Sequence, residues 1–169
     1  MIWLYVLIIV LANVITAMFQ PINFCGLIIP CGSFLVGATF FLRDFVQLRV
    51  GKANIYKLIV IAAGISCVIS VLLGDLLSVT IASVVSFFIS EVFDTELFTR
   101  LSGSLKKRVV VSGLVGGTLD STVFVVLALS PIWSGILPWE YVPYAILGQT
   151  LVKCCMQFIA LPLFSRVDK

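Results

Sequence analysis

Two residues of opposite charge, Asp120 and Lys153, interrupt apolar segments that are long enough to cross a lipid bilayer. Each lies about ten to twelve residues into its segment, which places it near mid-membrane at about 1.5 Å per helical residue. A charged side chain at that depth costs about 2.5–3.5 kcal/mol to insert, and it usually faces a partner or a cavity. We therefore expect Asp120 and Lys153 to converge on a polar site inside a helix bundle, an arrangement typical of transporters.

Two interpretations of this pair of charges are open. It forms a structural ion pair without a ligand, or it belongs to a substrate site. The second is favoured because desolvation offsets most of the attraction within a buried pair. Nearby segments add amides, hydroxyls and aromatic rings that suit a flat, neutral heterocycle with N–H donors, namely Asn13, Gln149, Gln157, Ser121, Thr122, Phe124 and Phe158.

The composition indicates which elements must hold these residues. Of 169 residues, 61% are hydrophobic and only 11% are charged, whereas soluble domains have about 25% charged residues. At about 20 residues per crossing, the length allows six spans and no soluble domain. We predict an all-α membrane protein with a single six-helix domain, residues 1–169, whose spans lie at about 2–19, 27–42, 56–73, 76–93, 109–129 and 144–164.

The basic residues divide unevenly between the loops. With six spans, ten of the eleven lysines and arginines lie on one side, in the loops after the second and fourth spans and in the tail with Arg166 and Lys169. The positive-inside rule then places both termini in the cytoplasm, so the predicted topology is N-in/C-in. Because these residues set topology, the net charge of +3 is no sign of nucleic-acid binding, and a lipid bilayer is the expected surroundings.

Residue types that several kinds of chemistry need are missing from the chain. It has no histidine, and its five cysteines show no CxxC spacing. We therefore expect no enzyme activity, no metal and no cofactor, and we interpret the cysteines as small apolar residues. A Walker motif is also missing, so the energy for transport must come from a gradient, a partner or metabolic trapping.

Small polar residues recur at steps of three or four along the fourth span, which indicates helix packing or the lining of a solute path. They are Thr80, Ser83, Ser86, Ser90 and Asp94. The segments TFFLRDF (39–45) and SFFISEVF (86–93) also resemble each other, since in both an acid follows paired phenylalanines before a basic loop. This weak repeat is compatible with two duplicated three-helix halves.

Two polar residues in the first two spans have open roles. Asn13 lies at mid-depth, where packing against another helix and contact with a ligand are equally supported. Asp44 lies near a helix end, where a solvated carboxylate paired with Arg43 or Arg49 is the alternative to a role in the site.

Several motifs resemble the queuosine precursor transporter family, which is also called the vitamin uptake transporter family. Members are six-helix proteins of the bacterial inner membrane, and this chain looks like their compact form. The resemblance implies import of 7-deazaguanine precursors of queuosine, a tRNA modification, with 7-cyano-7-deazaguanine as an example. The motifs follow the family's order over nearly the whole chain, and they are LANVITAMF (11–19), FLRDF (41–45), ISEVFDTELFTRL (89–101), LDSTVF (119–124) and GQTLVK (148–153) with a following ALP.

The resemblance also implies which residues bind the substrate. The expected substrate is a small, planar, purine-like heterocycle. Matched motif by motif, the family's polar positions fall on Asn13, Asp44, Asp94, Asp120, Gln149 and Lys153.

Other functions are compatible with the same elements. A substrate-capture subunit of an energy-coupling factor vitamin transporter also has six short helices and a similar size. Its ATPase partner would dock on a face of small residues, either Gly113 and Gly117 or Ser33 and Gly37. The glycines of the fifth span would also suit a homodimer face. A membrane scaffold without a transported solute is the third alternative, and it predicts that Asp120 and Lys153 can be replaced together without loss of function.

Overall fold

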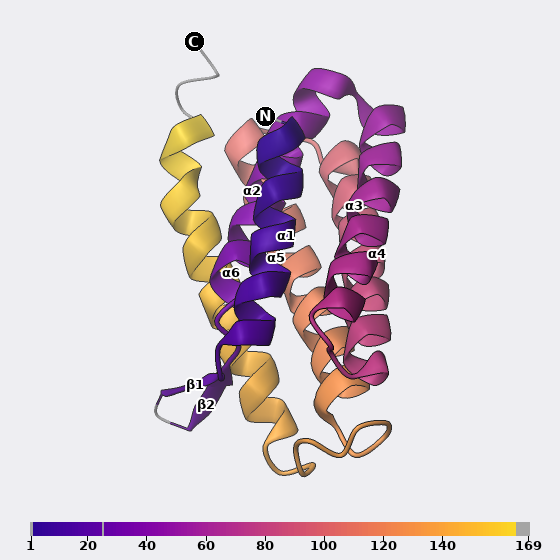
Figure 1. The fold of residues 1–169 in the computed structure, drawn as a ribbon. Coiled ribbons are helices and arrows are strands. Elements are labelled where there is room, and N and C mark those ends of the chain that lie inside the picture. The colour runs from indigo at the N-terminus through magenta and orange to yellow at the C-terminus, as the bar shows by residue number, and fades with distance from the viewer. Residues whose placement is uncertain (1, 25, 165–169) are drawn as a thin grey trace.

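The computed structural model describes residues 2–24 and 26–164, and within them the apolar segments form six α-helices (Figure 1). A short π-helix, η1 (Val125–Leu129), continues α5. The all-α fold with six helices is confirmed. The bounds of the α-helices are α1 Ile2–Met18, α2 Ser33–Val50, α3 Lys52–Leu72, α4 Leu77–Arg100, α5 Leu105–Phe124 and α6 Val142–Phe164.

Apolar side chains cover the outside of the bundle, while several charged side chains are buried inside it. Trp3 and Leu72 are 84% and 79% exposed, whereas Arg43 and Glu91 are fully buried. This distribution reverses that of a water-soluble protein, as expected for helices surrounded by lipid. Within the described residues, four helical segments are long and apolar enough to cross a membrane, namely α3, α4, α5 with η1, and α6. The chain is therefore a multi-pass membrane protein, and the exact limits of its spans stay a prediction.

Helix α2 forms the centre of the bundle, because it contacts each of the other five helices described. A helix in that position needs partners for its polar groups more than an apolar surface for lipid. This explains why α2 carries the buried side chains of Arg43, Asp44 and Gln47. It also explains why α2 does not rank among the apolar spans, while α1, with 17 residues, is apolar but shorter.

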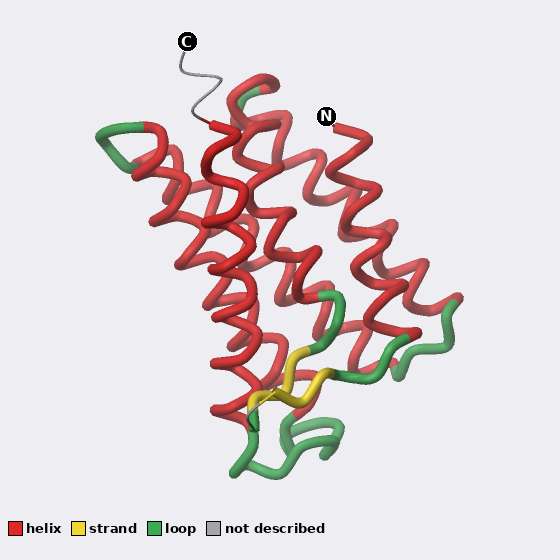
Figure 2. Tube along the Cα trace, turned by 90° about the vertical axis from the view of Figure 1, so that its left-hand side faces the viewer, coloured by secondary structure: helices red, strands yellow, loops and turns green. Residues whose placement is uncertain are grey.

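The start of α1 and the end of α6 lie at the same end of the bundle (Figure 1), together with the α2–α3 connection at Gly51. A hairpin of two short strands and the loop at 130–141 lie at the opposite end (Figure 2). This arrangement agrees with an even number of crossings. Arg166 and Lys169 lie outside the described residues, and the cytoplasmic orientation of the termini stays a prediction.

Helix α2 starts and ends later than the second predicted span. Its start is displaced because Leu27–Ile29 forms strand β2, which pairs antiparallel with β1 (Ile22–Phe24) and places Phe24 opposite Leu27. The tight turn between the strands needs Gly26, whose φ is +82°. Its end is displaced to Val50 because the polar residues after position 42 are buried within the bundle instead of facing water.

Helices α4 and α5 likewise extend further toward each other than the predicted spans do. The last turns of α4 are held by Glu96, whose carboxylate contacts Lys52 Nζ at 2.6 Å and Arg100 Nε at 3.2 Å. Ser104 caps α5, since its hydroxyl accepts a hydrogen bond from the backbone N–H of Lys107. Only residues 101–104 are left to connect the two helices.

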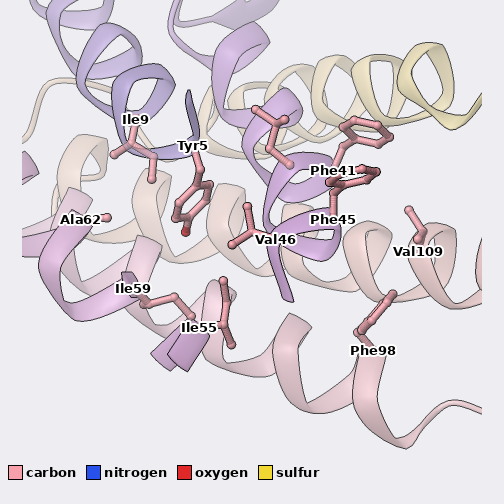
Figure 3. Packing of buried hydrophobic residues seen from close by; sticks show 11 residues of the cluster. Tyr5, Ile9, Phe41, Phe45, Val46, Ile55, Ile59, Ala62, Phe98 and Val109 are labelled. Carbon is pink, nitrogen blue, oxygen red and sulfur yellow. The ribbon is translucent and has the colours of Figure 1, made fainter. Parts of the chain in front are cut away.

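The largest apolar core fills the end of the bundle that contains the start of α1 (Figure 3). Tyr5 and Ile9 of α1 pack there against Val46 of α2 and Ile59 of α3. Phe98 and Val109 extend this core to α4 and α5, so it excludes water from the polar groups that it surrounds.

Helix α2 approaches α6 so closely at Gly37 that a Cβ atom there would lie 2.9 Å from the Cα atom of Lys153. We expect Gly37→Ala to push α2 away from α6 and to lower the stability by about 1–3 kcal/mol, measured as the Tm in detergent. The matched control is Gly64→Ala in α3, where an added Cβ meets no described atom within 4 Å. That change should be neutral or stabilising by up to about 1 kcal/mol. Equal Tm values for the two variants would contradict this packing.

Candidate functional site

The side chains of Asp120 and Lys153 meet in the interior of the bundle, as expected from the sequence. Lys153 Nζ lies 2.6 Å from Asp120 Oδ2, and the two residues are only 3% and 7% exposed. The ammonium also donates to Ser121 Oγ at 2.9 Å and to Gln149 Oε1 at 3.4 Å. The second carboxylate oxygen of Asp120 accepts a hydrogen bond of 3.5 Å from Ser90 Oγ. The pair therefore links α4, α5 and α6.

Two glycines, one on α5 and one on α2, lie against Lys153. At Gly117, one turn before Asp120 on α5, an added Cβ would lie 3.5 Å from the Cβ of Lys153. Gly37 of α2 lies against the backbone of Lys153 from another direction. The stem of the lysine is thus enclosed on two sides, which fixes the position of its ammonium group.

A cavity of about 70 Å³ opens beside the pair, and all six described helices contribute to its lining. Since a single water needs about 10–15 Å³ on this scale, the cavity has room for several. Its aromatic walls are Phe87 and Phe124. The polar residues in its lining are Asn13, Thr16, Ser33, Thr39, Ser66, Ser83, Ser86, Asp120, Gln149 and Lys153.

Two amide side chains in this lining differ in how their N–H groups are used. Asn13 Nδ2 donates to Ser66 Oγ, so α1 and α3 are joined across the cavity. Gln149 Nε2 has no hydrogen-bond partner among the described residues, although Gln149 is only 2% exposed. A buried donor without a partner costs about 1–3 kcal/mol, so a ligand that accepts this hydrogen bond would gain that energy.

Several residues that the sequence suggested for the lining lie elsewhere. Gln157 Nε2 donates to the backbone oxygen of Val109 at 2.6 Å and thereby joins α6 to α5. Thr122 donates to the backbone of Thr118 within its own helix, and the ring of Phe158 is 53% exposed. The sequence suggested these residues because they are near Asp120 and Lys153 along the chain, but the face of α6 that carries Phe158 turns outward.

A second group of charges surrounds Arg43 and does not line the cavity. We name Arg43, Asp44, Glu91 and Asp94 the Arg43 cluster, and all four side chains are fully buried. Arg43 Nη2 contacts Asp44 Oδ1 at 2.6 Å and also Asp94 Oδ2. Arg43 Nε lies 3.5 Å from Glu91 Oε2. The alternative interpretation of Asp44 is right about its pairing with Arg43, but it is wrong about solvation, because α2 is the central helix and buries the carboxylate.

The six residues implied by the resemblance therefore divide into two groups. The structure brings Asn13, Asp120, Gln149 and Lys153 together on the cavity, and it places Asp44 and Asp94 in the Arg43 cluster. The substrate-binding role of each residue stays a prediction.

Sequence reasoning considered Arg43 only as an alternative partner of Asp44, and it assigned no separate role to Glu91 or Ser66. A signal for the first two was present in the similar segments at 39–45 and 86–93, whose acids now share one guanidinium. Ser66 gave no signal beyond its place on a helix face with other small residues.

The cysteines and the possible metal ligands can be located among the described residues. The four described cysteines, Cys31, Cys67, Cys154 and Cys155, are free thiols, and Cys25 lies outside the described residues. The described part of the chain contains no group of three or more cysteine or acidic side chains arranged to hold a metal ion.

The sequence model of one protein family, described as "Putative vitamin uptake transporter", matches residues 68–167, which is more than half of the chain. The chain belongs to this family. The matched part of the transporter includes Glu91 and Asp94 of the Arg43 cluster, and it includes the cavity residues Asp120, Gln149 and Lys153. Comparison with curated proteins and with solved structures gave no match.

Proposed function

We propose that this transporter imports a 7-deazaguanine precursor of queuosine, such as 7-cyano-7-deazaguanine, across the bacterial inner membrane. The observation that carries the proposal is the cavity beside a buried carboxylate and a buried amide donor without a described partner. A vitamin-type uptake function follows from the family. The 7-deazaguanine substrate rests on the resemblance of the motifs and on the chemistry of the lining.

The polar groups of the lining complement a flat, neutral heterocycle. Asp120 can accept N–H donors from a purine-like edge, and Gln149 Nε2 can donate to a ring nitrogen or carbonyl oxygen. Phe87 and Phe124 offer faces or edges to an aromatic ring. Because the acid and the amide lie on different helices, α5 and α6, a bound substrate would join them.

An alternative assignment is a substrate-capture subunit that works with an ATPase partner. The glycine face of α5 does not favour this alternative, since Gly113 already packs against the side chain of Gln157 and Gly116 against Asp94. Purification of the transporter from its native membrane distinguishes the two. Stoichiometric ATPase subunits would support the alternative, and a homodimer or monomer without them would support a self-sufficient carrier.

The direct test is uptake of labelled 7-cyano-7-deazaguanine by cells that cannot make the compound. Cells that express the transporter should accumulate label and restore queuosine in tRNA, whereas cells with the empty vector should not. Uptake at the empty-vector level, with the protein present in the membrane, would remove this substrate assignment.

Gln149 provides a finer test of the same site. Gln149→Met keeps the volume of the side chain but removes the amide donor, together with the oxygen that accepts the long 3.4 Å hydrogen bond from Lys153 Nζ. We expect the apparent KM for uptake to rise about 2- to 12-fold, equivalent to about 0.5–1.5 kcal/mol for one hydrogen bond. The maximal rate should change less than KM. Gln20→Met is the matched control, because Gln20 is exposed at the end of the bundle that holds the hairpin. An unchanged KM in Gln149→Met would show that the amide does not contact the substrate.

A further inference from the structure

The Arg43 cluster contains more negative than positive charge. One guanidinium faces three carboxylates, so full ionisation would leave a formal net charge of −2. All four side chains are fully buried, and the apolar core shown in Figure 3 fills the end of the bundle that contains the start of α1. Uncompensated charge in such surroundings is strongly unfavourable, so further positive charge must offset it. One bound proton would lower the net charge to −1 and leave the remainder to nearby basic side chains.

The donors of Arg43 do not serve the three acids equally. Nη2 is shared by Asp44 and Asp94, while Nη1 donates to Thr95 Oγ1 at 2.7 Å and to the backbone oxygen of Glu91 at 3.4 Å. For the carboxylate of Glu91 only Nε is left, at 3.5 Å. Apart from this contact, the polar neighbour of the Glu91 carboxylate is the hydroxyl of Tyr5, whereas Asp44 and Asp94 both contact Nη2 directly. Glu91 is therefore the acid whose charge the arginine compensates least.

A second polar group lies at the same place. Tyr5 of α1 is fully buried beside Val46 and Ile59 (Figure 3), and its hydroxyl lies next to Glu91. This hydroxyl can act as a hydrogen-bond partner of Glu91 in both protonation states: a protonated Glu91 could donate to the Tyr5 oxygen, and an ionised Glu91 could accept from it.

The charged groups on neighbouring helices offset only part of the excess. Asp120 of α5 adds a negative charge that acts on Glu91, and that aspartate is paired with Lys153 of α6. Arg108 of α5, whose Nε donates to the backbone oxygen of Phe98, is near enough to act on Asp44, so its positive charge offsets part of the excess at Asp44.

The two remaining elements around Glu91 add no positive charge to the cluster. From α3, Tyr56 Oη binds Glu96 further along α4, and Lys52 binds the same carboxylate. On α4 itself, the nearest acid is Asp94, which also faces the hydroxyl of Ser112 on α5.

We propose that Glu91 is a proton-binding site that couples substrate uptake to the proton gradient. A metal cation would have to share the space that the guanidinium already occupies between the carboxylates, whereas a proton bonds to one carboxylate oxygen and needs no cavity. The proton comes from water on one side of the membrane, adds to Glu91, and leaves to water on the other side. No electrons move in this step.

Short structural links connect Glu91 to the substrate cavity. Ser90, the preceding residue, reaches Asp120 Oδ1 at 3.5 Å. Gly116, one turn before Asp120, lies so close to Asp94 that an added Cβ would be 2.9 Å from the Cβ of Asp94. A substrate that changes the contacts of Asp120 would therefore change the electrostatic surroundings of Glu91 and shift its proton occupancy.

The proton site can be tested without substrate, by infrared spectroscopy of the purified transporter. At neutral pH we expect the carbonyl band of a buried carboxylic acid, and we expect Glu91→Gln to lose it while remaining folded, because the neutral amide has the shape of the protonated acid. Asp94→Asn and the exposed control Glu140→Gln should keep the band. A spectrum that Glu91→Gln leaves unchanged, or a Glu91→Gln chain that fails to fold, would overturn the proton site.

Coupling rests on the proposed function and is tested in proteoliposomes with labelled 7-cyano-7-deazaguanine. One proton moved with a neutral substrate across about 100 mV supports up to about 50-fold accumulation. The wild type should accumulate label toward that limit, whereas Glu91→Gln should only equilibrate it. Equilibration without accumulation by the wild type would overturn the coupling. A Glu91-dependent infrared band without any uptake would instead overturn the substrate assignment and leave the proton site intact.

Discussion

Arg43→Met is expected to leave little folded protein in the membrane, because it removes the guanidinium from three buried carboxylates. Removing one partner of a buried charged network costs about 3–5 kcal/mol, a large part of the roughly 5–15 kcal/mol that stabilises a typical protein. Arg43→Lys should rescue the fold only in part, since a lysine has three donors and cannot reproduce the planar fork that contacts α2 and α4. The measurement is the yield of monodisperse protein in detergent, together with its Tm.

The matched control for this prediction is Arg49→Met. Arg49 also lies on α2 but is exposed, and it stacks over the ring of Phe45 with 5.0 Å between Cζ and the ring centroid. Its loss should cost about 0.5–1 kcal/mol. If Arg43→Met and Arg49→Met gave similar yields and Tm values, the Arg43 cluster would not hold α2 and α4 together.

Asp120 and Lys153 give the second large expected effect, because each single change leaves the other charge buried and without its partner. Asp120→Asn and Lys153→Met should each destabilise the transporter by about 3–5 kcal/mol. The double variant should recover most of that loss, since a neutral amide and an apolar side chain replace both charges together. Uptake should stay absent in the double variant, because the carboxylate that would bind the substrate is gone.

Stability and uptake of these variants are measured separately, by Tm in detergent and by label accumulated in cells. A double variant that regains both stability and uptake would place the substrate site elsewhere in the bundle. Loss of uptake with recovered stability would indicate that Asp120 and Lys153 act in substrate binding.

The approach of Asp120 to Lys153 could be predicted from sequence because depth in a membrane helix follows from counting residues. The row of small polar residues on α4 was informative in the same way, since Ser83 and Ser86 line the cavity and Ser90 contacts Asp120. Helical periodicity fixes which residues share a face. It does not fix which way that face turns, so the exposure of Phe158 could not be predicted.

Hairpin β1–β2 and the central place of α2 were not predictable by the same reasoning. The run Leu27–Ile29 is apolar, and a short apolar run does not distinguish a strand from the start of a membrane helix. The burial of Arg43 and Asp44 depends on α2 packing against the other five described helices. Such packing is a property of the assembled bundle. Arg43 and Asp44, which the sequence placed near the end of a helix, therefore lie in the middle of a buried charged cluster.

Equilibrium binding of labelled 7-cyano-7-deazaguanine to the purified transporter measures whether the site at Asp120 and Lys153 binds the substrate. We expect saturable binding by the wild type and by the control Asp75→Asn, whose carboxylate lies at the α3–α4 turn. For the folded double variant Asp120→Asn/Lys153→Met, we expect affinity lower by at least about 10-fold, equivalent to the loss of a charged hydrogen bond of about 1.5–3 kcal/mol. Equal affinity in the double variant and the wild type, or no binding by the wild type, would contradict substrate binding at this site.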